Sequence, residues 1–239
     1  MLDTILMDLD GTLLPMGQQE FVDNYFSRLC RRFATNGVEP GALTKAVWKG
    51  TAAMVKNDGA ALNRERFWDT FAGLMGRALR EREPEFDDFY GREFDQTREI
   101  IRPHAPRRPV IDGLKAKGYR LVLATNPLFP AVGVKTRLHW VGLAPEDFSL
   151  VTTYENSRFC KPNPDYYREI LSKIGKAPGD CLMVGNNTDE DLAAASLGMA
   201  VYLITDFLEN EKKVDISGIP HGSFEDFCAF CGALPVLGS

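Results

Sequence analysis

The 239-residue sequence has no apolar run long enough to span a membrane, no internal repeat and no low-complexity tract. No charged segment followed by an apolar stretch precedes Asp3, so we expect no secretion signal. We therefore expect a globular chain without a membrane partner. With 44% hydrophobic residues, this length is sufficient for one large domain, or for a core domain that carries a smaller one.

The sequence also lacks an excess of basic residues. It contains 28 lysines and arginines against 33 aspartates and glutamates, which gives a formal net charge of −5. Proteins that bind nucleic acid usually carry a strong basic field, so we predict no nucleic-acid partner. A small anionic ligand would instead need positive charge placed locally in its site.

Cysteine and histidine are few and scattered. The five cysteines are an odd number, which favours a reduced, cytoplasmic protein. Cys228 and Cys231 have the spacing of a metal or redox pair, but no second pair or nearby histidine accompanies them, so we interpret them as packing residues. The histidines form no ligand spacing, and we interpret them as structural: His104, His139 and His221.

Short apolar runs alternate with helical segments through much of the sequence. Brief runs that end at turn signals are typical of buried strands, and they occur at residues 4–9, 119–127, 148–155, 181–187 and 200–205. Helical patterns lie between the later runs, ending at 117–118 and covering 129–141, 164–174 and 190–197. Strands separated by helices at this spacing predict a parallel sheet, and hence an α/β core of residues 1–14 and 102–239.

Residues 15–101 interrupt this alternation. Aromatic and aliphatic residues recur there at helical spacing between stop signals such as Asn36-Gly37 and Pro103, which predicts roughly four helices and no strand. We therefore predict an all-helical insertion. Its aromatic residues, including Trp48 and Trp68, are interpreted as helix core rather than as substrate contacts.

Polar residues follow the expected strands at the sheet edge where open parallel sheets bind ligands. Asp8 and Asp10 follow the first strand, Thr125 and Asn126 the second, Lys161 the third, and Asn186, Asn187 and Asp191 the fourth. Adjacent carboxylates repel unless a hard cation or a shared proton offsets their charge, and oxygen ligands select Mg²⁺. The pattern therefore predicts a magnesium site.

Magnesium usually bridges to phosphate, and the other residues suit a phosphoryl group. Thr125, Asn126 and the Lys161 ammonium would provide hydrogen bonds and positive charge, together with backbone N–H groups around Gly11. One carboxylate could then attack phosphorus while the other transfers a proton.

Four segments resemble the motifs of the haloacid dehalogenase (HAD) superfamily. Asp8-Leu9-Asp10-Gly11-Thr12 is similar to its first motif, Thr125-Asn126 to its second, Lys161-Pro162 to its third, and VGNNTDED at 184–191 to its fourth. The insertion directly after the first motif is similar to the subgroup with a helical C1 cap. The resemblance covers essentially the whole chain and implies a Rossmann-like parallel sheet core with an inserted all-helical cap.

The resemblance also implies a function, namely a Mg²⁺-dependent phosphatase that acts on a small phosphorylated metabolite. Asp8 would be the nucleophile that forms an aspartyl-phosphate, and also a metal ligand. Asp10 would be the general acid/base and bind the metal through its backbone carbonyl. Thr125 and Lys161 would hold the phosphoryl group. Family dehalogenases lack an aspartate at the position of Asp10, so its presence favours phosphate chemistry.

The fourth segment departs from the family pattern of Gly-Asp followed by a later aspartate. Here Asn186 and Asn187 follow Gly185, and Asp191 matches the later aspartate. An asparagine oxygen can bind Mg²⁺ but adds no charge, which predicts weaker metal binding. The sequence leaves open which asparagine would face the metal, and both could instead cap the next helix.

Other interpretations also stay open. Alone, the Asp8–Thr12 segment could be a strand with an acidic turn, Thr125-Asn126 a turn, and Lys161 a solvated lysine. A phosphomutase would share the whole site and differ only in cap contacts, for which the candidates are Lys45, Lys49, Arg64 and Arg66. A binding protein without turnover would follow from weak metal retention, although the intact carboxylates, hydroxyl and lysine argue against it.

Overall fold

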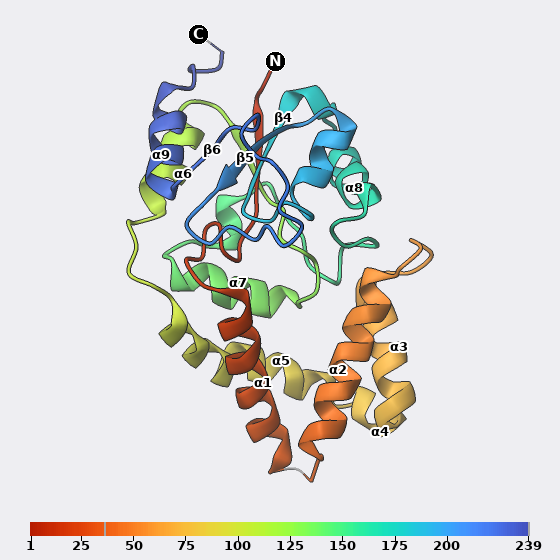
Figure 1. Cartoon of the computed structure of the whole chain (residues 1–239). Coiled ribbons are helices and arrows are strands. Elements are labelled where there is room, and N and C mark those ends of the chain that lie inside the picture. The colour runs from red at the N-terminus through yellow and green to blue at the C-terminus, as the bar shows by residue number, and fades with distance from the viewer. Residues whose placement is uncertain (36, 239) are drawn as a thin grey trace.

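The computed structural model describes residues 1–35 and 37–238, and six strands in it form one parallel sheet. The strand order is β3-β2-β1-β4-β5-β6, and Figure 1 labels β4, β5 and β6 of this sheet. The strands are β1 (Thr4–Met7), β2 (Arg120–Leu123), β3 (Leu150–Val151), β4 (Cys181–Gly185), β5 (Ala200–Ile204) and β6 (His221–Gly222). The α/β fold class is thereby confirmed, and β1 lies between β2 and β4.

Side chains on opposite faces of β1 belong to two different core layers. Ile5 and Met7 pack in the cluster that holds the buried residues of α6 (Arg108–Ala116) and α9 (Phe224–Ala233). Leu6 packs in the cluster of α8 (Pro164–Ile174) and the 3₁₀ segment η4 (Leu192–Leu197). Because successive strand residues point to opposite faces, a strand covered on both faces must be apolar at consecutive positions.

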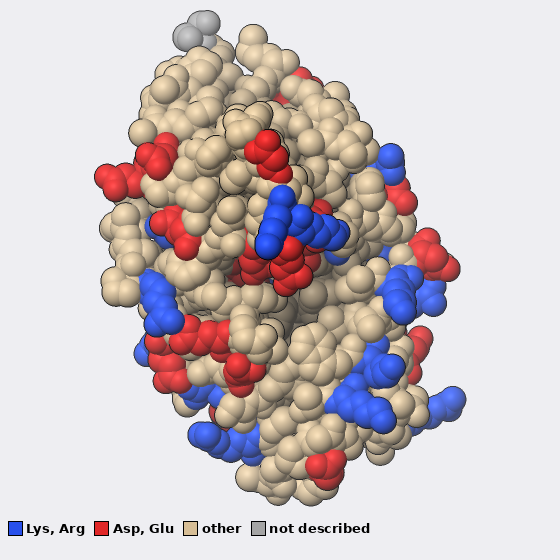
Figure 2. Space-filling view, viewed as in Figure 1, with Lys and Arg blue, Asp and Glu red and all other residues tan. Residues whose placement is uncertain are grey.

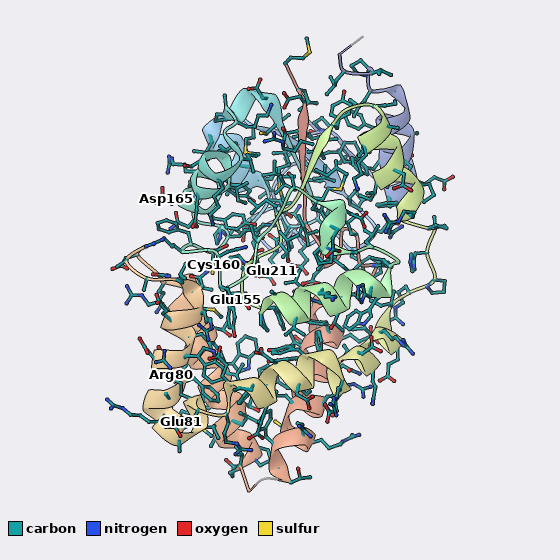
Figure 3. The ribbon with its side chains drawn as sticks, turned by 180° about the vertical axis from the view of Figure 1, so that it is seen from behind. Arg80, Glu81, Glu155, Cys160, Asp165 and Glu211 are labelled. Carbon is teal, nitrogen blue, oxygen red and sulfur yellow. The ribbon has the colours of Figure 1, made fainter. Side chains whose placement is uncertain are left out.

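Between β1 and α6 the described chain forms only helices and irregular segments. These helices are α1 (Gln18–Ala34), α2 (Pro40–Val55), α3 (Asn63–Met75), α4 (Arg77–Arg80), α5 (Glu83–Gly91) and the 3₁₀ helix η1 (Glu93–Ile100). They extend from one end of the sheet layers, and Figure 3 places Arg80 and Glu81 far from that junction and Glu155 and Cys160 close to it. None of the helices in the described chain is both long and apolar enough to cross a membrane.

The helix α1 shows why this segment folds as it does. Its buried residues, Phe21, Tyr25, Leu29 and Phe33, recur every four positions and so form one apolar face. Phe21 and Tyr25 both pack edge-on against Phe94 of η1. The predicted helix stop at Asn36 lies outside the described residues.

Several elements differ from the sequence-based expectations. β3 has two residues instead of the run 148–155, and shortly after it the Thr153 N–H donates to Asn156 Oδ1 rather than to a neighbouring strand. Residues 192–197 form a 3₁₀ helix rather than an α-helix, ending at Gly198 in the left-handed region. β6 and α9 were not anticipated. The remaining elements are α7 (Ala131–Trp140), η2 (Pro145–Asp147) and η3 (Pro178–Asp180).

Gly11 provides a test of the turn that follows β1. Its φ is +78°, and a Cβ there would lie 2.2 Å from Asn186 Nδ2. We expect Gly11→Ala to lower the free energy of unfolding by about 1–3 kcal/mol, through left-handed strain and overpacking. Gly113→Ala is the matched control because Gly113 is helical with no atom near its Cβ position, and it should stabilise by about 0.5–1 kcal/mol. The measurement is chemical denaturation, and equal changes in the free energy of unfolding for Gly11→Ala and Gly113→Ala would contradict this account.

Candidate functional site

The carboxyl ends of β1, β2 and β4 meet at a pocket that we call the carboxylate pocket. Residues from all three strand ends line it: Asp8, Asp10, Thr125, Asn126, Asn186, Asn187 and Asp191. Gln18 and Phe21 of α1 line it from the helical insertion, and Figure 2 shows acidic side chains gathered in a hollow between the two parts. The strand order produces this convergence, because β1 lies between β2 and β4.

Lys161 is fully buried and pairs with two carboxylates that line the carboxylate pocket, Asp8 and Asp191. Its Nζ donates hydrogen bonds to Asp8 Oδ1 at 2.8 Å and to Asp191 Oδ1 at 2.7 Å. Burial favours the neutral amine, but Asp191 and Asp8 outweigh it and raise the pKa of Lys161 well above its usual value. The interpretation of Lys161 as a solvated surface lysine is therefore wrong.

Burial is the main influence on Asp8. It raises the pKa of the Asp8 carboxyl, while Lys161 acts in the opposite direction. Lys161 occupies Oδ1, and within the described chain no hydrogen bond is donated to Oδ2. A cation near Oδ2 would favour the charged form of Asp8, which is the form that can act as a nucleophile.

Asp10 is held by a cation that sequence analysis did not identify. Arg137 of α7 is fully buried, and its Nη1 donates to Asp10 Oδ2. The Arg137 guanidinium also lies 4.4 Å from the ring centre of Phe129. Asp10 Oδ1 is buried without a hydrogen-bond partner in the described chain. The two oxygens of Asp10 are therefore distinct: one is fixed and the other is unoccupied.

The residues after β2 form a polar wall. Thr125 is buried, and its carbonyl accepts hydrogen bonds from Thr152 Oγ1 and from the Tyr166 hydroxyl. Asn126 Nδ2 donates to Glu190 Oε1 at 2.9 Å, while Asn126 Oδ1 is buried with no partner in the described chain. Burial raises the pKa of Glu190 to about 7. Glu190 thus lines the site, although it was not among the predicted residues.

The side chains of Asn186 and Asn187 both organise the loop after β4. Asn186 Oδ1 accepts from Thr12 Oγ1 at 3.0 Å, and its Nδ2 donates to the Phe207 carbonyl at 2.7 Å. Asn187 Oδ1 accepts the N–H groups of Asp189 and Glu190, which is the capping arrangement anticipated as an alternative. Of the two, Asn186 has the amide oxygen with fewer hydrogen bonds.

Asp191 connects this loop to Lys161. Its Oδ2 accepts the backbone N–H groups of Asn186 and Asn187, and its Oδ1 accepts from Lys161. Three hydrogen bonds on one carboxylate fix its position. Asp191 is therefore a positioning residue for the lysine and the loop in this arrangement.

Gly11 is an expected site residue that does not line the carboxylate pocket. Its N–H donates to the Leu14 carbonyl at 2.8 Å, so this amide is used within the turn rather than directed at a ligand. The glycine is required there by its positive φ and by the adjacent Asn186 side chain.

The pocket carries more negative than positive charge. Five carboxylates line it: Asp8, Asp10, Glu190, Asp191 and Glu209. In the described chain only Lys161 and Arg137 pair with them. The buried oxygens without partners, Asp10 Oδ1 and Asn126 Oδ1, add to this imbalance. An oxygen-rich, negatively charged pocket of this kind fits a hard divalent cation.

The protein atoms alone would not complete a metal coordination shell. Within the described chain, no group of three or more His, Cys, Asp or Glu side chains is arranged to hold a metal ion. A cation would therefore need carbonyl or amide oxygens, water or phosphate oxygens as further ligands, which is the usual situation for Mg²⁺.

The predicted cap contacts lie elsewhere. Arg64 pairs with Glu83 and Arg66 with Asp58, while Lys45 and Lys49 are exposed, and none of the four lines the carboxylate pocket. Trp68 is buried as expected. The prediction for Trp48 is wrong, because its side chain is 49% exposed and lines a second cavity.

Sequence reasoning missed Arg137, Glu190 and Glu209. Arg137 had a usable signal, since it follows Val134 by three positions and therefore lies on the buried face of its helix. Glu209 had none, because a loop remote in sequence brings it to Asn187, whose Nδ2 donates to it at 2.7 Å.

A family profile described as haloacid dehalogenase-like hydrolase matches residues 2–198. The chain belongs to the haloacid dehalogenase-like hydrolases. This family membership confirms the resemblance carried by the four segments.

Curated relatives of this HAD-like hydrolase are phosphatases by name. Pyrophosphatase PpaX of Bacillus velezensis is 27% identical over 131 residues, which cover 55% of this chain and 58% of the relative. Glyceraldehyde 3-phosphate phosphatase of Methanothermobacter thermautotrophicus is 30% identical over 115 residues, or 48% of this chain and 50% of the relative. The chain thus spans little more than half the length of these two relatives.

Solved structures with the same fold include two reaction classes. A predicted phosphoglycolate phosphatase from Haemophilus somnus 129pt matches with a TM-score of 0.58 at 21% identity, covering 96% of this chain and 97% of that chain. The L-2-haloacid dehalogenase RSc1362 matches with a TM-score of 0.58 at 14% identity, covering 97% and 99%. These likenesses support the fold alone, so the chemistry of this HAD-like hydrolase must be argued from its site.

The ion pair between Arg137 and Asp10 can be tested by substitution. Arg137→Met should lower the free energy of unfolding by about 3 kcal/mol, because it leaves a carboxylate without its buried cation. Combined with Asp10→Asn, the loss should be smaller than the sum of the single losses, by about 1 kcal/mol or more. Additive losses in a denaturant double-mutant cycle would show that the two side chains are not coupled.

Proposed function

We propose that this chain is a Mg²⁺-dependent phosphatase that removes phosphate from a small organic phosphomonoester through an aspartyl-phosphate on Asp8. The observation that carries the proposal is the buried Lys161 ammonium, hydrogen-bonded to both Asp8 and Asp191. It provides fixed positive charge beside the carboxylate that would attack phosphorus, where negative charge accumulates during transfer.

The reaction would proceed in two steps with this chain's own residues. Asp8 Oδ2 attacks phosphorus, the bond from phosphorus to the ester oxygen breaks, and Asp10 protonates the departing alcohol. Water then attacks the aspartyl-phosphate, Asp10 accepts its proton, and the bond from phosphorus to Oδ2 breaks to release phosphate. Thr125, Asn126 and Lys161 would hold the phosphoryl oxygens throughout.

Arg137 supports the proton transfer by fixing Asp10. Since Arg137 binds Oδ2, the proton would be carried by Oδ1, the oxygen without a partner in the described chain. Asp10 is thereby oriented before substrate arrives. Preorganised orientation is a large part of what an active site contributes to rate.

The residues that would hold Mg²⁺ are Asp8, the Asp10 carbonyl and Asn186, with Asn187 and Asp191 as the further candidates. The ion would offset the charge of the phosphate when bound. Asn186 is preferred over Asn187 as the metal ligand, because the Asn186 side-chain oxygen accepts a single hydrogen bond, from the Thr12 hydroxyl. An amide in place of a carboxylate there would hold the ion more weakly than a charged ligand.

The helical insertion 15–101 would act as a cap over a core made of residues 1–14 and 102–239. Gln18 and Phe21 already line the carboxylate pocket from the cap side. The two connections run together, since the Arg102 N–H donates to the Pro15 carbonyl at 3.0 Å. Cap closure about these connections would exclude water during transfer.

The five free cysteines support a reducing compartment such as the cytoplasm.

The first experiment measures phosphate release from a panel of small phosphomonoesters, with and without Mg²⁺. Asp8→Asn should lower kcat by at least about a thousandfold, because it removes the nucleophile and little volume. Asp112→Asn is the control, since Asp112 lies on the exposed face of α6 and should leave kcat unchanged. Near wild-type activity in Asp8→Asn would contradict the mechanism. Binding without release, or transfer of phosphate to a second position, would favour a binding protein or a phosphomutase.

The role of Asn186 can be measured without turnover. Asn186→Asp loses the hydrogen bond to the Phe207 carbonyl and adds charge to an acidic pocket, so the metal-free protein should lose about 1–3 kcal/mol of stability. Added Mg²⁺ should restore more stability to this variant than to the wild type, because the ion gains a charged ligand. Asn187→Asp is the comparison. The measurement is the thermal unfolding temperature of each variant as a function of Mg²⁺ concentration. If Mg²⁺ stabilises Asn186→Asp no more than it stabilises the wild type, the role of Asn186 as a metal ligand is contradicted.

A further inference from the structure

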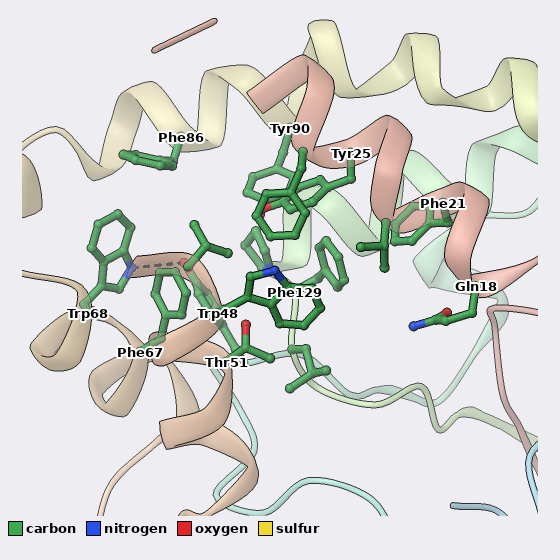
Figure 4. Close-up of a pocket in the computed structure, with 16 residues that line it drawn as sticks. Gln18, Phe21, Tyr25, Trp48, Thr51, Phe67, Trp68, Phe86, Tyr90 and Phe129 are labelled. Carbon is green, nitrogen blue, oxygen red and sulfur yellow. Dashed lines mark hydrogen bonds between the residues drawn. The ribbon is translucent and has the colours of Figure 1, made fainter. Parts of the chain in front are cut away.

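A second cavity, which we call the aromatic pocket, lies between the cap helices and two loops of the core. Its walls carry the rings of Phe21, Tyr25, Trp48, Phe67, Trp68 and Phe129 (Figure 4). The cavity has a volume of about 780 Å³ including its open mouth. Its enclosed space is about 90 Å³, which has room for several water molecules or for an organic group of about that size.

The aromatic pocket adjoins the carboxylate pocket. Gln18, Phe21, Leu128 and Phe129 line both cavities. A phosphoryl group beside Asp8 would therefore direct its ester oxygen and the attached organic group toward the aromatic pocket. This cavity is where the leaving group of a phosphomonoester has room.

Four polar groups of the aromatic pocket bind one another, and the side chains of Gln18, Trp48 and Thr51 also line the cavity. The hydroxyls of Tyr25 and Tyr90 share a hydrogen bond of 2.8 Å, and Trp68 Nε1 donates to the Tyr154 hydroxyl at 3.3 Å. Among the described residues, no Lys, Arg, Asp or Glu lines this cavity. A carboxylate or a second phosphate on the substrate would lose its hydration there without gaining a cation.

Trp48 is a half-exposed aromatic residue in the lining of this cavity. It is 49% exposed at the pocket, and it lies 5.4 Å from Phe26, centre to centre. Large exposed aromatic surface around a concave site is typical of a binding site for an apolar group.

We propose that the aromatic pocket binds the leaving group of the substrate, and that this group is uncharged, apolar and about the size of an aromatic ring. The substrate class is thus a hydrophobic phosphomonoester. Pyrophosphate and small carboxylated phosphates would be poor substrates. This inference rests on the proposed phosphatase function and specifies its substrate class.

The test compares 2-phenylethyl phosphate with ethyl phosphate in the presence of Mg²⁺. Both are esters of primary alcohols, so their leaving groups differ little in chemistry and mainly in apolar surface. We expect kcat/KM to be at least tenfold higher for 2-phenylethyl phosphate, which corresponds to about 1.4 kcal/mol of transition-state stabilisation. Pyrophosphate and 2-phosphoglycolate should be poorer than both esters.

Two substitutions address the aromatic pocket itself. Trp48→Ala removes an exposed wall of the cavity, and Thr51→Trp fills it from the half-buried position on α2. Each should lower the ratio of the two kcat/KM values toward one. Leu74→Ala is the control, because Leu74 is a similarly exposed apolar residue of α3 outside the cavity, and the ratio should stay unchanged.

The outcomes separate this inference from the proposed function. If ethyl phosphate is hydrolysed with Mg²⁺ and Asp8, but 2-phenylethyl phosphate is not preferred, the aromatic pocket is not the leaving-group site and the phosphatase function stands. If no ester is hydrolysed, the proposed function fails. Calorimetry with 2-phenylethyl phosphonate then tests whether the aromatic pocket binds the organic group. Binding that is weakened by Trp48→Ala and not by Leu74→Ala supports the assignment. Absence of binding overturns it.

Discussion

The buried ammonium of Lys161 is the interaction on which the site depends. A buried charge is strongly unfavourable unless it is paired, so Lys161 requires Asp8 and Asp191 at hydrogen-bond distance. Asp191 in turn accepts two backbone N–H groups of the loop after β4. One lysine therefore links the carboxylate that follows β1 to the loop that follows β4, and it holds in place the carboxylate that would attack phosphorus.

A second buried cation completes the arrangement around Asp10. Arg137 reaches it from α7, so the orientation of the proposed acid depends on a helix packed beneath the sheet edge. The two cations offset only part of the negative charge of the pocket. The remaining charge suits Mg²⁺, and the uncharged aromatic cavity next to it suits an apolar leaving group. The phosphoryl group of a phosphomonoester would thus lie in the carboxylate pocket, and its organic leaving group in the aromatic pocket.

Much of the site could be predicted because the residues after parallel strands must converge at one sheet edge. Asp8, Thr125 and Asn186 needed only strand positions and strand polarity for their placement. Arg137 and Glu209 could not be predicted in the same way, since their positions depend on how a helix and a distant loop pack. The aromatic pocket escaped prediction because helical periodicity indicates which face is apolar, and not whether a residue such as Trp48 on that face is covered.

The sequence by itself determined the parallel α/β core, the helical insertion and the order of the polar strand ends, because hydrophobic period and turn residues are local properties. It also determined the hydrolase family through its four motifs. Only the tertiary structure decided that Gly11 serves the turn after β1, that Asn187 caps the turn after β4, and that Arg137 binds Asp10. These outcomes depend on contacts between residues far apart in the chain, which local patterns do not specify.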